Sequence, residues 1–250
     1  MNIRFIGCAP RNFRTGRSNH QVEAVVIHLI DGSQVGCDAT FLDNNLTDPR
    51  SAHYSISKSG VIHQYVDEQD TAFHSGRVVN PTWPGLKLGS DGRPVNPNLY
   101  TIGIEHEGRP NDEWPDEMYI ASAALLRAIA ERNPALSTLS ERNVAMHRQI
   151  RADKSCPGFK FSLQRLLLEA GQSPPDVLSS PTAVRITTAV NLRLGRPTTK
   201  APVVRVIAKD SLVNVVGHVT GDAVQGNNRW YRTLEDNFFW AGATDIPNPQ

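Results

Sequence analysis

Reactive side chains are concentrated between residues 146 and 159, M-H-R-Q-I-R-A-D-K-S-C-P-G-F. His147 follows the apolar run 144–146, which predicts a buried strand that holds the imidazole at its end. Cys156 comes nine residues later and is followed by a Pro-Gly pair, which favours a turn and fixes the thiol in a loop. Imidazole and thiolate are ligands that zinc prefers, so this stretch predicts half of a zinc site.

A catalytic zinc ion takes three protein ligands and leaves the fourth position to water, so a third ligand is needed. His28 lies within the run V-V-I-H-L-I (25–30), which is typical of a central strand buried on both faces. A histidine in such a core is also found as a satisfied structural residue, and the pattern leaves both roles open. The pair of His147 and Cys156 is equally open, because no tight spacing such as H-E-x-x-H supports it.

Five short blocks follow one another along the chain: His28, S-A-H-Y (51–54), A-F-H-S-G (72–76), I-G-I-E (102–105) and H-x6-K-x-C-P-G (147–158). In this order they resemble the zinc-dependent N-acetylmuramoyl-L-alanine amidases. That family also contains phage T7 lysozyme and the peptidoglycan recognition proteins. The blocks cover roughly residues 20 to 170.

The resemblance implies a Zn²⁺ cofactor bound by His28, His147 and Cys156. Some members of the family carry aspartate where Cys156 stands. A cysteine at this position is similar to the branch of T7 lysozyme and the recognition proteins. Members that bind the cell wall without cutting it typically lack this cysteine, so its presence favours an enzyme.

The resemblance also implies catalytic roles for Glu105 and Lys154. Amide hydrolysis needs a base for the attacking water, a positive charge beside the oxyanion and a proton for the leaving amine. Glu105 would carry the proton from the activated water to the leaving nitrogen, while Lys154 would face the oxyanion. Three more residues match family positions near the substrate, and we assign them to substrate binding or to support of the metal ligands: His53, Tyr54 and His74.

The implied reaction is hydrolysis of the amide bond between N-acetylmuramic acid and L-alanine in peptidoglycan. The alternative from another class is a non-catalytic peptidoglycan-recognition protein with a structural zinc. An open zinc position beside Glu105 and Lys154 would separate the two. A third hypothesis, a thiol hydrolase built from Cys156 and His147, leaves His28 and Glu105 without a role.

The net charge and the lengths of the apolar runs limit the classes of partner that the protein can bind. A chain of 250 residues with a net charge of +1 lacks the strongly basic face that nucleic acid demands. No apolar run approaches the ~18 residues required to span a bilayer. We therefore expect peptidoglycan as the partner, no nucleic acid, no membrane and a monomeric protein.

The first residues predict synthesis in the cytoplasm, because they lack the apolar core of about 7 to 15 residues found in a secretory signal. The implied place of action is the bacterial cell wall, as for a phage or prophage endolysin, and a bacterial source stays open. Three cysteines do not suggest a disulfide framework. We expect free thiols at Cys8 and Cys37, with one bridge between them as the alternative.

The order of elements predicts an α/β domain with a mixed central sheet flanked by helices, as the resemblance also implies. The strand-like run 101–108 alternates, so its isoleucines share one face and Glu105 lies on the other. The long segment between His74 and Tyr100, rich in proline and glycine, predicts a rim or lid over a site. Further strands are expected at 25–30, 51–56, 61–66 and 144–146, and helices at 38–45, 115–133 and 163–171.

The amino-acid composition changes at S-P-P-D-V-L-S-S-P (173–181), a stretch that is typical of a semi-rigid linker. We predict a zinc amidase domain at 1–172, a linker at 173–182 and a small all-β barrel at 183–250. This tail resembles the bacterial SH3-like domains of cell-wall enzymes, which implies wall binding. The resemblance depends on A-V-N-L-R-L-G-R (189–196), D-S-L-V-N-V-V-G (210–217), R-W-Y-R-T-L (229–234) and F-F-W-A (238–241). Trp230 and Trp240 either fill the barrel or line a groove.

Overall fold

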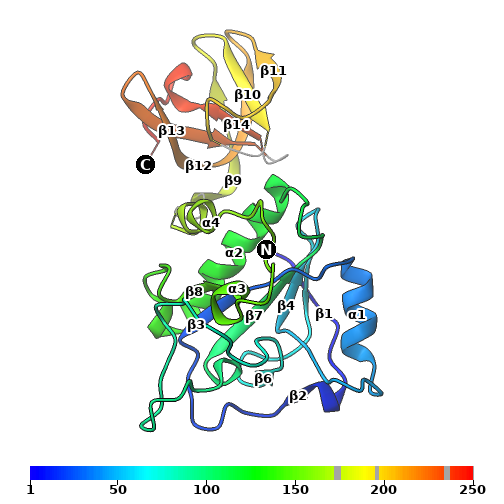
Figure 1. Cartoon of the computed structure of the whole chain (residues 1–250). Helices are drawn as coiled ribbons and strands as arrows, with labels where there is room; N and C mark the ends of the chain where they lie inside the picture. The colour runs from blue at the N-terminus through cyan, green and yellow to red at the C-terminus, as the bar shows by residue number, and fades with distance from the viewer. Residues whose placement is uncertain (172–175, 195–196, 234–236, 250) are drawn as a thin grey trace. The chain divides into compact units, whose positions relative to one another are not determined.

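The computed structural model describes residues 1–171, 176–194, 197–233 and 237–249. The chain divides into two compact units, Met1–Gly171 and Gln172–Gln250, and each is described by itself (Figure 1). Among the described helices, none has both the length and the apolar composition to cross a membrane.

The first unit is built on a six-stranded sheet with the order β1-β5-β4-β7-β3-β8. Strand β3 lies between β7 and β8 and is parallel to both, and β7 is also parallel to β4. Strands β4 and β5 form an antiparallel hairpin, so the sheet is mixed, as predicted. The bounds are β1 (Ile3–Phe5), β3 (Ala24–Ile27), β4 (Tyr54–Ile56), β5 (Ile62–Gln64), β7 (Thr101–His106) and β8 (Val144–Met146).

Helices begin where the sequence offers capping groups. The Ser33 side chain accepts a hydrogen bond from the Gly36 N–H at the start of α1, and Ser162 caps α4 in the same way. The first turn of α2 carries two acidic residues, which complement the positive end of the helix. The helices are α1 (Gln34–Leu42), α2 (Asp116–Arg132), α3 (His147–Ile150) and α4 (Leu163–Ala170), with 3-10 turns at Pro10–Asn12, Pro97–Leu99 and Pro134–Leu136.

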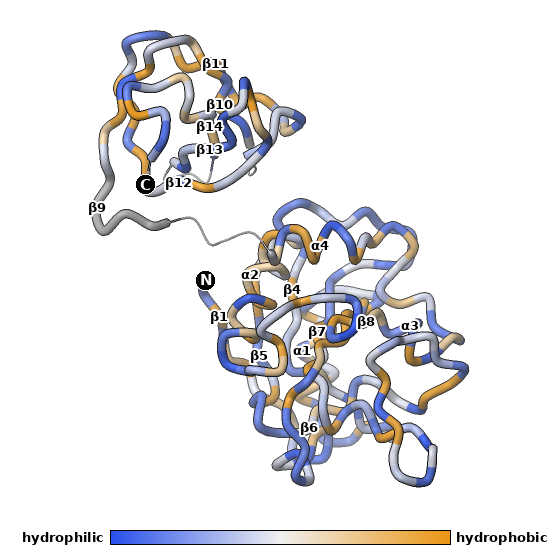
Figure 2. Tube along the Cα trace, turned by 90° about the vertical axis from the view of Figure 1, so that its left-hand side faces the viewer, coloured by the Kyte–Doolittle hydropathy of each residue, from blue (hydrophilic) through white to orange (hydrophobic). Residues whose placement is uncertain are grey.

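The central strands are covered differently on their two faces. The residues Val25, Ile27, Ile102 and Ile104 are fully buried and pack with apolar side chains of α2 and α4 in one large core. On the other face, Ala24, Val26 and Ala145 pack against Trp83 and Tyr100 from the segment after β6 (Thr71–Ala72). Figure 2 shows apolar residues along the central strands and polar residues in the outer loops. One face therefore carries α2 and α4, while the other carries the long segment 74–100 over the central strands and α1 beside β4.

The first twenty residues are held to the rest of the unit by strand pairing and by buried hydrogen bonds. Strand β1 pairs in parallel with β5 at the edge of the sheet, and β2 (Phe13–Arg14) pairs with β6. Arg17 is buried and donates hydrogen bonds to the carbonyls of Glu68, Asn98 and Thr101. Five N–H groups on one planar guanidinium allow this single side chain to tie the N-terminal segment to residues 68 and 98–101.

The second unit is a six-stranded sheet with the order β11-β10-β14-β13-β12-β9, antiparallel at each described pairing. Its buried core includes Val184, Val215, Tyr231 and Phe239, and Trp230 is buried as well. The strands are β9 (Asp176–Arg185), β10 (Val190–Leu194), β11 (Val203–Ile207), β12 (Leu212–Val224), β13 (Asn227–Arg232) and β14 (Asn237–Trp240), and a 3-10 turn follows at Ala241–Ala243.

The predicted linker is shorter than its composition indicated. Residues 176–182 belong to β9, which pairs with β12, while 173–175 lie outside the described residues. Strand β9 lies at the edge of its sheet, and Pro181 falls between Val177 and Thr182, where the pairing with β12 shifts register, so its nitrogen is not required to donate a ladder hydrogen bond. A proline- and serine-rich composition therefore does not distinguish a linker from an edge strand.

The first unit has its own sheet and core, so we predict that residues 1–171 fold alone. A fragment of these residues should unfold in urea in one cooperative transition, because its large core lies wholly within that range. Circular dichroism and tryptophan fluorescence should report the same midpoint. Non-coincident transitions, or a fragment that stays aggregated, would contradict independent folding.

Candidate metal centre

Three predicted ligands, His28, His147 and Cys156, come together at one end of the central sheet. One ligand atom from each lies within 4.8 Å of the other two. His28 directly follows β3 and His147 directly follows β8, and these parallel strands pair in register from Val25 to Ile27. The two imidazole centroids are consequently 4.4 Å apart. Neighbouring parallel strands end at the same edge of the sheet, and this places the two histidines together.

The same ladder brings Glu105 beside His28. The His28 N–H donates to the Ile104 carbonyl at 2.8 Å, and the His28 carbonyl accepts from the His106 N–H at 3.1 Å. This is the parallel pattern in which one residue bonds to both neighbours of its partner, so His28 stands opposite Glu105. Paired residues of parallel strands point to the same face. The carboxylate therefore lies on the face that carries the metal ligands.

Cys156 reaches the site from a loop. Its Sγ accepts a hydrogen bond from the Leu29 N–H at 2.8 Å, directly after His28. Two bonds from Arg148 hold the loop: its N–H donates to the Cys156 carbonyl at 3.0 Å and its Nη1 to the Gly158 carbonyl at 2.7 Å. Gly158 has φ +101°, a conformation that favours glycine. The Pro-Gly pair thus serves the predicted turn.

The donor set fits a zinc ion. Two imidazoles and one thiol match the ligand types of a three-ligand catalytic site, and the three ligand atoms lie within 4.8 Å of one another. The outer nitrogens of both rings are already engaged. Nε2 of His147 lies 3.1 Å from the Ser75 carbonyl, and Nε2 of His28 lies 2.9 Å from Nδ1 of His74. Each ring therefore keeps Nδ1 for a metal.

Burial keeps all three groups uncharged in the metal-free protein. It lowers the pKa of His28 well below its usual value and, with smaller effects from nearby charges, brings the pKa of His147 to about 4. It raises the pKa of the Cys156 thiol. A neutral thiol beside neutral imidazoles is a poor nucleophile, which disfavours a thiol hydrolase. The imidazoles are already in the form that binds a metal, and the thiol would lose its proton on metal binding.

Glu105 has the environment of a proton carrier. Burial raises the pKa of its carboxyl group to about 8. Among the described residues, its buried Oε2 has no hydrogen-bond partner. The side chain lines a cavity of about 380 Å³ together with Phe41, Arg50 and the turn 30–33. A carboxyl group that can hold or release its proton near neutral pH suits general acid–base catalysis.

Lys154 stands at the rim of the site. Its side chain is exposed, in contrast to the buried ligands. Burial sets the direction of both shifts, and the positive charge of Lys154 lowers the pKa of His147 further and offsets part of the rise in the pKa of Cys156. An exposed ammonium at this position can approach a bound substrate from the solvent side.

The three predicted substrate-binding residues differ in position. His74 is buried and contacts His28 through its ring. His53 is fully buried, and its Nδ1 accepts a hydrogen bond from the Gly103 N–H at 3.0 Å, which leaves it no surface for a substrate. Tyr54 packs into the core under α2 and donates to Glu68 at 2.8 Å. The structure brings His74 to the metal ligands, keeps His53 behind them and puts Tyr54 on the opposite face.

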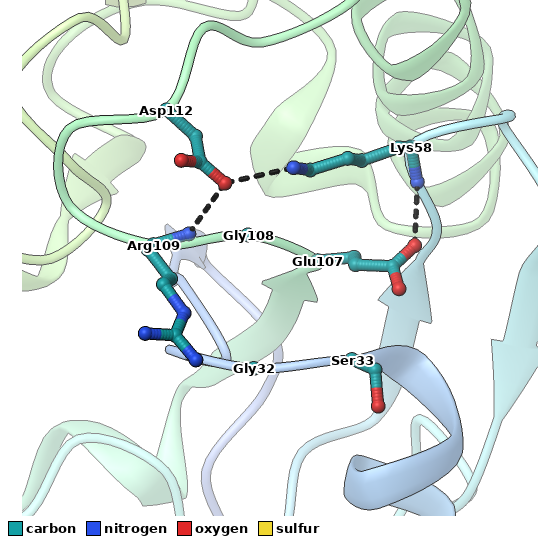
Figure 3. Close-up of a pocket in the computed structure, with 7 residues that line it drawn as sticks. All are labelled: Gly32, Ser33, Lys58, Glu107, Gly108, Arg109 and Asp112. Atoms are coloured by element: carbon teal, nitrogen blue, oxygen red, sulfur yellow. Dashed lines mark hydrogen bonds and ion pairs between the residues drawn. The ribbon is translucent and has the colours of Figure 1, made fainter.

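A second hollow with charged walls adjoins the Glu105 cavity (Figure 3). It has a volume of about 390 Å³ and shares Gly32 and Ser33 with that cavity. Lys58 Nζ lies 2.7 Å from Asp112, and Glu107 accepts a hydrogen bond from the Lys58 N–H. Figure 3 shows the Arg109 side chain turned toward Gly32. The wall therefore carries both signs of charge.

Sequence reasoning missed the residues that support the ligand rings. Ser75, Asn98 and Thr101 are buried beside His74 and bond to it or to one another. Small polar residues within proline-rich segments are common in loops, so their types alone carried no signal. The A-F-H-S-G block included Ser75 but drew attention only to its histidine.

Comparison with known proteins identifies relatives of the first unit. A family model described as N-acetylmuramoyl-L-alanine amidase (Amidase_2) matches residues 18–159. N-acetylmuramoyl-L-alanine amidase A of Achromobacter lyticus is 36% identical over 118 residues, which is 46% of this chain. The crystal structure of a selenomethionine derivative of AmpD is 25% identical with a TM-score of 0.54, covering 67% of this chain and 93% of that one. The matched region spans 55% of the Achromobacter protein.

The raised pKa of Glu105 predicts a pH dependence of stability in chelator-treated protein. The folded pKa of about 8 lies above the ordinary 4.5, so the folded state binds this proton more tightly. Its contribution is fully present below pH 4.5 and is lost as the pH rises toward 8, by at most about 1.4 kcal/mol per pH unit. Urea unfolding at pH 5 to 8 should show a smaller loss in Glu105→Gln than in the unchanged protein. An equal loss of unfolding free energy between pH 5 and 8 in the two proteins would contradict the raised pKa of Glu105.

Proposed function

Because the chain belongs to the N-acetylmuramoyl-L-alanine amidase family, we propose that it hydrolyses the amide bond between N-acetylmuramic acid and L-alanine in peptidoglycan. The observation that carries this proposal is the position of Glu105 opposite His28, on the face that holds three potential metal ligands. A hydrolase needs a proton carrier at this place, whereas a purely structural metal site does not.

We propose that His28, His147 and Cys156 hold a zinc ion. When bound there, zinc would act as a Lewis acid and make water acidic enough to lose a proton near neutral pH. Support comes from the donor set and from the Nδ1 atoms that both rings keep free of the hydrogen bonds at Nε2. The Leu29 N–H that points at Cys156 Sγ favours the thiolate form required of a ligand.

Glu105 and Lys154 complete the reaction in this proposal. Glu105 accepts the proton that the attacking water loses as its oxygen bonds to the carbonyl carbon. The ammonium of Lys154 lies beside the oxyanion that forms on the carbonyl oxygen. Glu105 then donates its proton to the amide nitrogen as the carbon–nitrogen bond breaks, which leaves a free carboxylate and the amino group of L-alanine.

The substrate would lie across the two adjoining hollows. The Glu105 cavity is next to the ligands, and the charged pocket with Lys58 and Arg109 extends from it. Side chains of both signs suit a peptide stem, which carries carboxylate and amino groups. We therefore propose that the charged pocket receives the stem peptide.

We propose that the second unit is an SH3-like domain that binds the wall. Support comes from its six-stranded antiparallel sheet and from its basic composition after residue 183, with eight Lys and Arg against five Asp and Glu. Trp230 is buried and its indole N–H donates to the Asp222 carbonyl, which favours a packing role. Trp240 is only partly buried and remains the better candidate to contact wall polymer.

Glu105→Ala should keep its zinc and its fold but lose turnover by roughly 10² or more, the scale of general acid–base catalysis. Purified sacculi are digested with the zinc-loaded protein, and the new ends are identified by mass spectrometry. Free L-alanine amino ends paired with intact N-acetylmuramic acid would be expected. The exposed Glu117 on α2 offers a matched control, because Glu117→Ala removes a carboxylate on the helix-covered side.

Three outcomes would contradict parts of this proposal. New reducing sugar ends, or cuts within the peptide, would assign another bond to the enzyme. Equal release of L-alanine ends by Glu105→Ala and Glu117→Ala would remove Glu105 from the chemistry. A protein that binds sacculi but leaves no new ends, with zinc bound, would favour the recognition alternative.

Removal of the second unit should affect insoluble substrate only. A tethered wall-binding unit raises the local concentration of the enzyme on the polymer without touching the chemistry. Residues 1–171 should therefore cleave soluble muramyl peptides at the rate of the full chain, yet act more slowly on sacculi. The deficit on sacculi should shrink as salt is added, because screening weakens the contribution of the basic unit in the full chain. Equal rates of both proteins on sacculi would end the targeting proposal.

A further inference from the structure

Two buried hydrogen-bond chains end on the outer nitrogens of the metal histidines. One runs from Pro97 through Thr101 and His74 to His28, and the other reaches His147 through the Ser75 carbonyl. His74 and Ser75 are adjacent in sequence, so one dipeptide supports both rings. These supporting residues lie outside the set predicted from sequence, apart from His74 itself.

The direction of the first chain follows from counting protons. The single hydroxyl proton of Thr101 points to the Pro97 carbonyl at 2.7 Å. Its oxygen can then only accept from His74 Nε2 at 3.2 Å, so this nitrogen carries the ring proton. Neutral imidazole has one N–H, which leaves Nδ1 of His74 bare. That atom accepts from Nε2 of His28 at 2.9 Å, and Nδ1 of His28 is left bare in turn.

The second chain gives the same result for His147. A carbonyl oxygen can only accept, so the Nε2 of His147 that lies 3.1 Å from the Ser75 carbonyl is the protonated nitrogen. Its Nδ1 is therefore bare as well. Both rings present a lone pair on the same type of nitrogen before any metal arrives.

Asn98 holds the supporting dipeptide in place. Its Oδ1 accepts three hydrogen bonds, from the His74 N–H at 3.1 Å, the Ser75 N–H at 2.9 Å and the Ser75 hydroxyl at 2.9 Å. Asn98 is 7% exposed and Ser75 is 0% exposed, so water cannot replace these bonds. Glycine at position 103 leaves room for the His74 ring, because a Cβ there would lie 2.5 Å from Cγ of His74.

We propose that Thr101 and Asn98 are positioning residues for a divalent metal: Thr101 sets the proton of His74 and thereby of His28, and Asn98 fixes residues 74–75 so that both ligand rings present a bare Nδ1. This inference rests on the proposed zinc site and extends it from the ligands to the groups behind them. Partners of this kind orient metal-bound histidines and fix their tautomers, and their loss typically costs 10- to 100-fold in metal affinity.

Thr101→Val and Thr101→Ser form a matched pair for the test. Valine keeps the shape of threonine but offers no acceptor to His74 Nε2, whereas serine keeps the hydroxyl. Zinc affinity is measured by competition with a chromophoric chelator in the full-length protein. We expect Thr101→Val to bind Zn²⁺ about 10- to 100-fold more weakly, and Thr101→Ser to remain close to the unchanged protein.

Asn98→Ala and Asn133→Ala separate positioning from general stability. Both asparagines are buried, but Asn133 bonds to Glu68 and the Ile129 carbonyl, away from the ligands. Both variants should lose stability in urea, and only Asn98→Ala should also lose zinc affinity. Equal zinc affinity in the two variants would overturn the role of Asn98.

A spectroscopic readout tests the tautomers without any variant. In chelator-treated protein labelled with ¹⁵N-histidine, long-range ¹H–¹⁵N correlation should show His28, His74 and His147 with protonated Nε2 and bare Nδ1. A protonated Nδ1 on His28 or His74 would overturn the first chain. If the unchanged protein binds zinc and Thr101→Val binds it with the same affinity, this inference alone is contradicted. If the unchanged protein does not bind zinc, the proposed metal centre is removed as well.

Discussion

The candidate site depends on one constraint, the parallel pairing of β8, β3 and β7. Parallel strands end at the same edge of a sheet, so the residues that follow β8 and β3 meet there, and the ladder between β3 and β7 puts Glu105 opposite His28. Two potential ligands and a proton carrier are thereby positioned by backbone hydrogen bonds. A shift of one residue in either pairing would turn a side chain to the helix-covered face.

The two faces of the sheet have different roles, because one packs into the apolar core and the other carries the candidate site. The large apolar core under α2 and α4 holds the strands in register, and the opposite face is free to carry polar groups. Polar residues on that face are buried beneath the segment 74–100, which makes each unpaired group costly. These buried polar groups are accordingly paired in a nearly complete hydrogen-bond network. In it Arg17 bonds to residues 68 and 98–101, and Asn98 holds residues 74–75 behind the ligand rings.

Burial also sets the charge states on which the proposed chemistry relies. The same desolvation that lowers the pKa of His28 and His147 raises that of Glu105. Neutral imidazoles are available to a metal, and a carboxyl group with a pKa of about 8 can alternate between acid and base near neutral pH. The proposed ligation and the proposed proton transfer thus share one physical cause, the burial of these side chains at this edge of the sheet.

The sequence by itself determined the mixed sheet and its helices, because apolar periodicity is a local signal, whereas the three potential ligands His28, His147 and Cys156 were indicated by the resemblance of ordered blocks to a family. Because side chains alternate along a strand, the S-A-H-Y block could have shown that Tyr54 points to the face opposite His53. The similarity of the whole block to the family outweighed this signal. Only the tertiary structure decided that residues 176–182 join an edge strand, because pairing with β12 is non-local. It alone revealed Asn98 and Thr101 as hydrogen-bond partners of His74, which stands behind His28, since these bonds join segments whose order in the sequence carries no sign of contact.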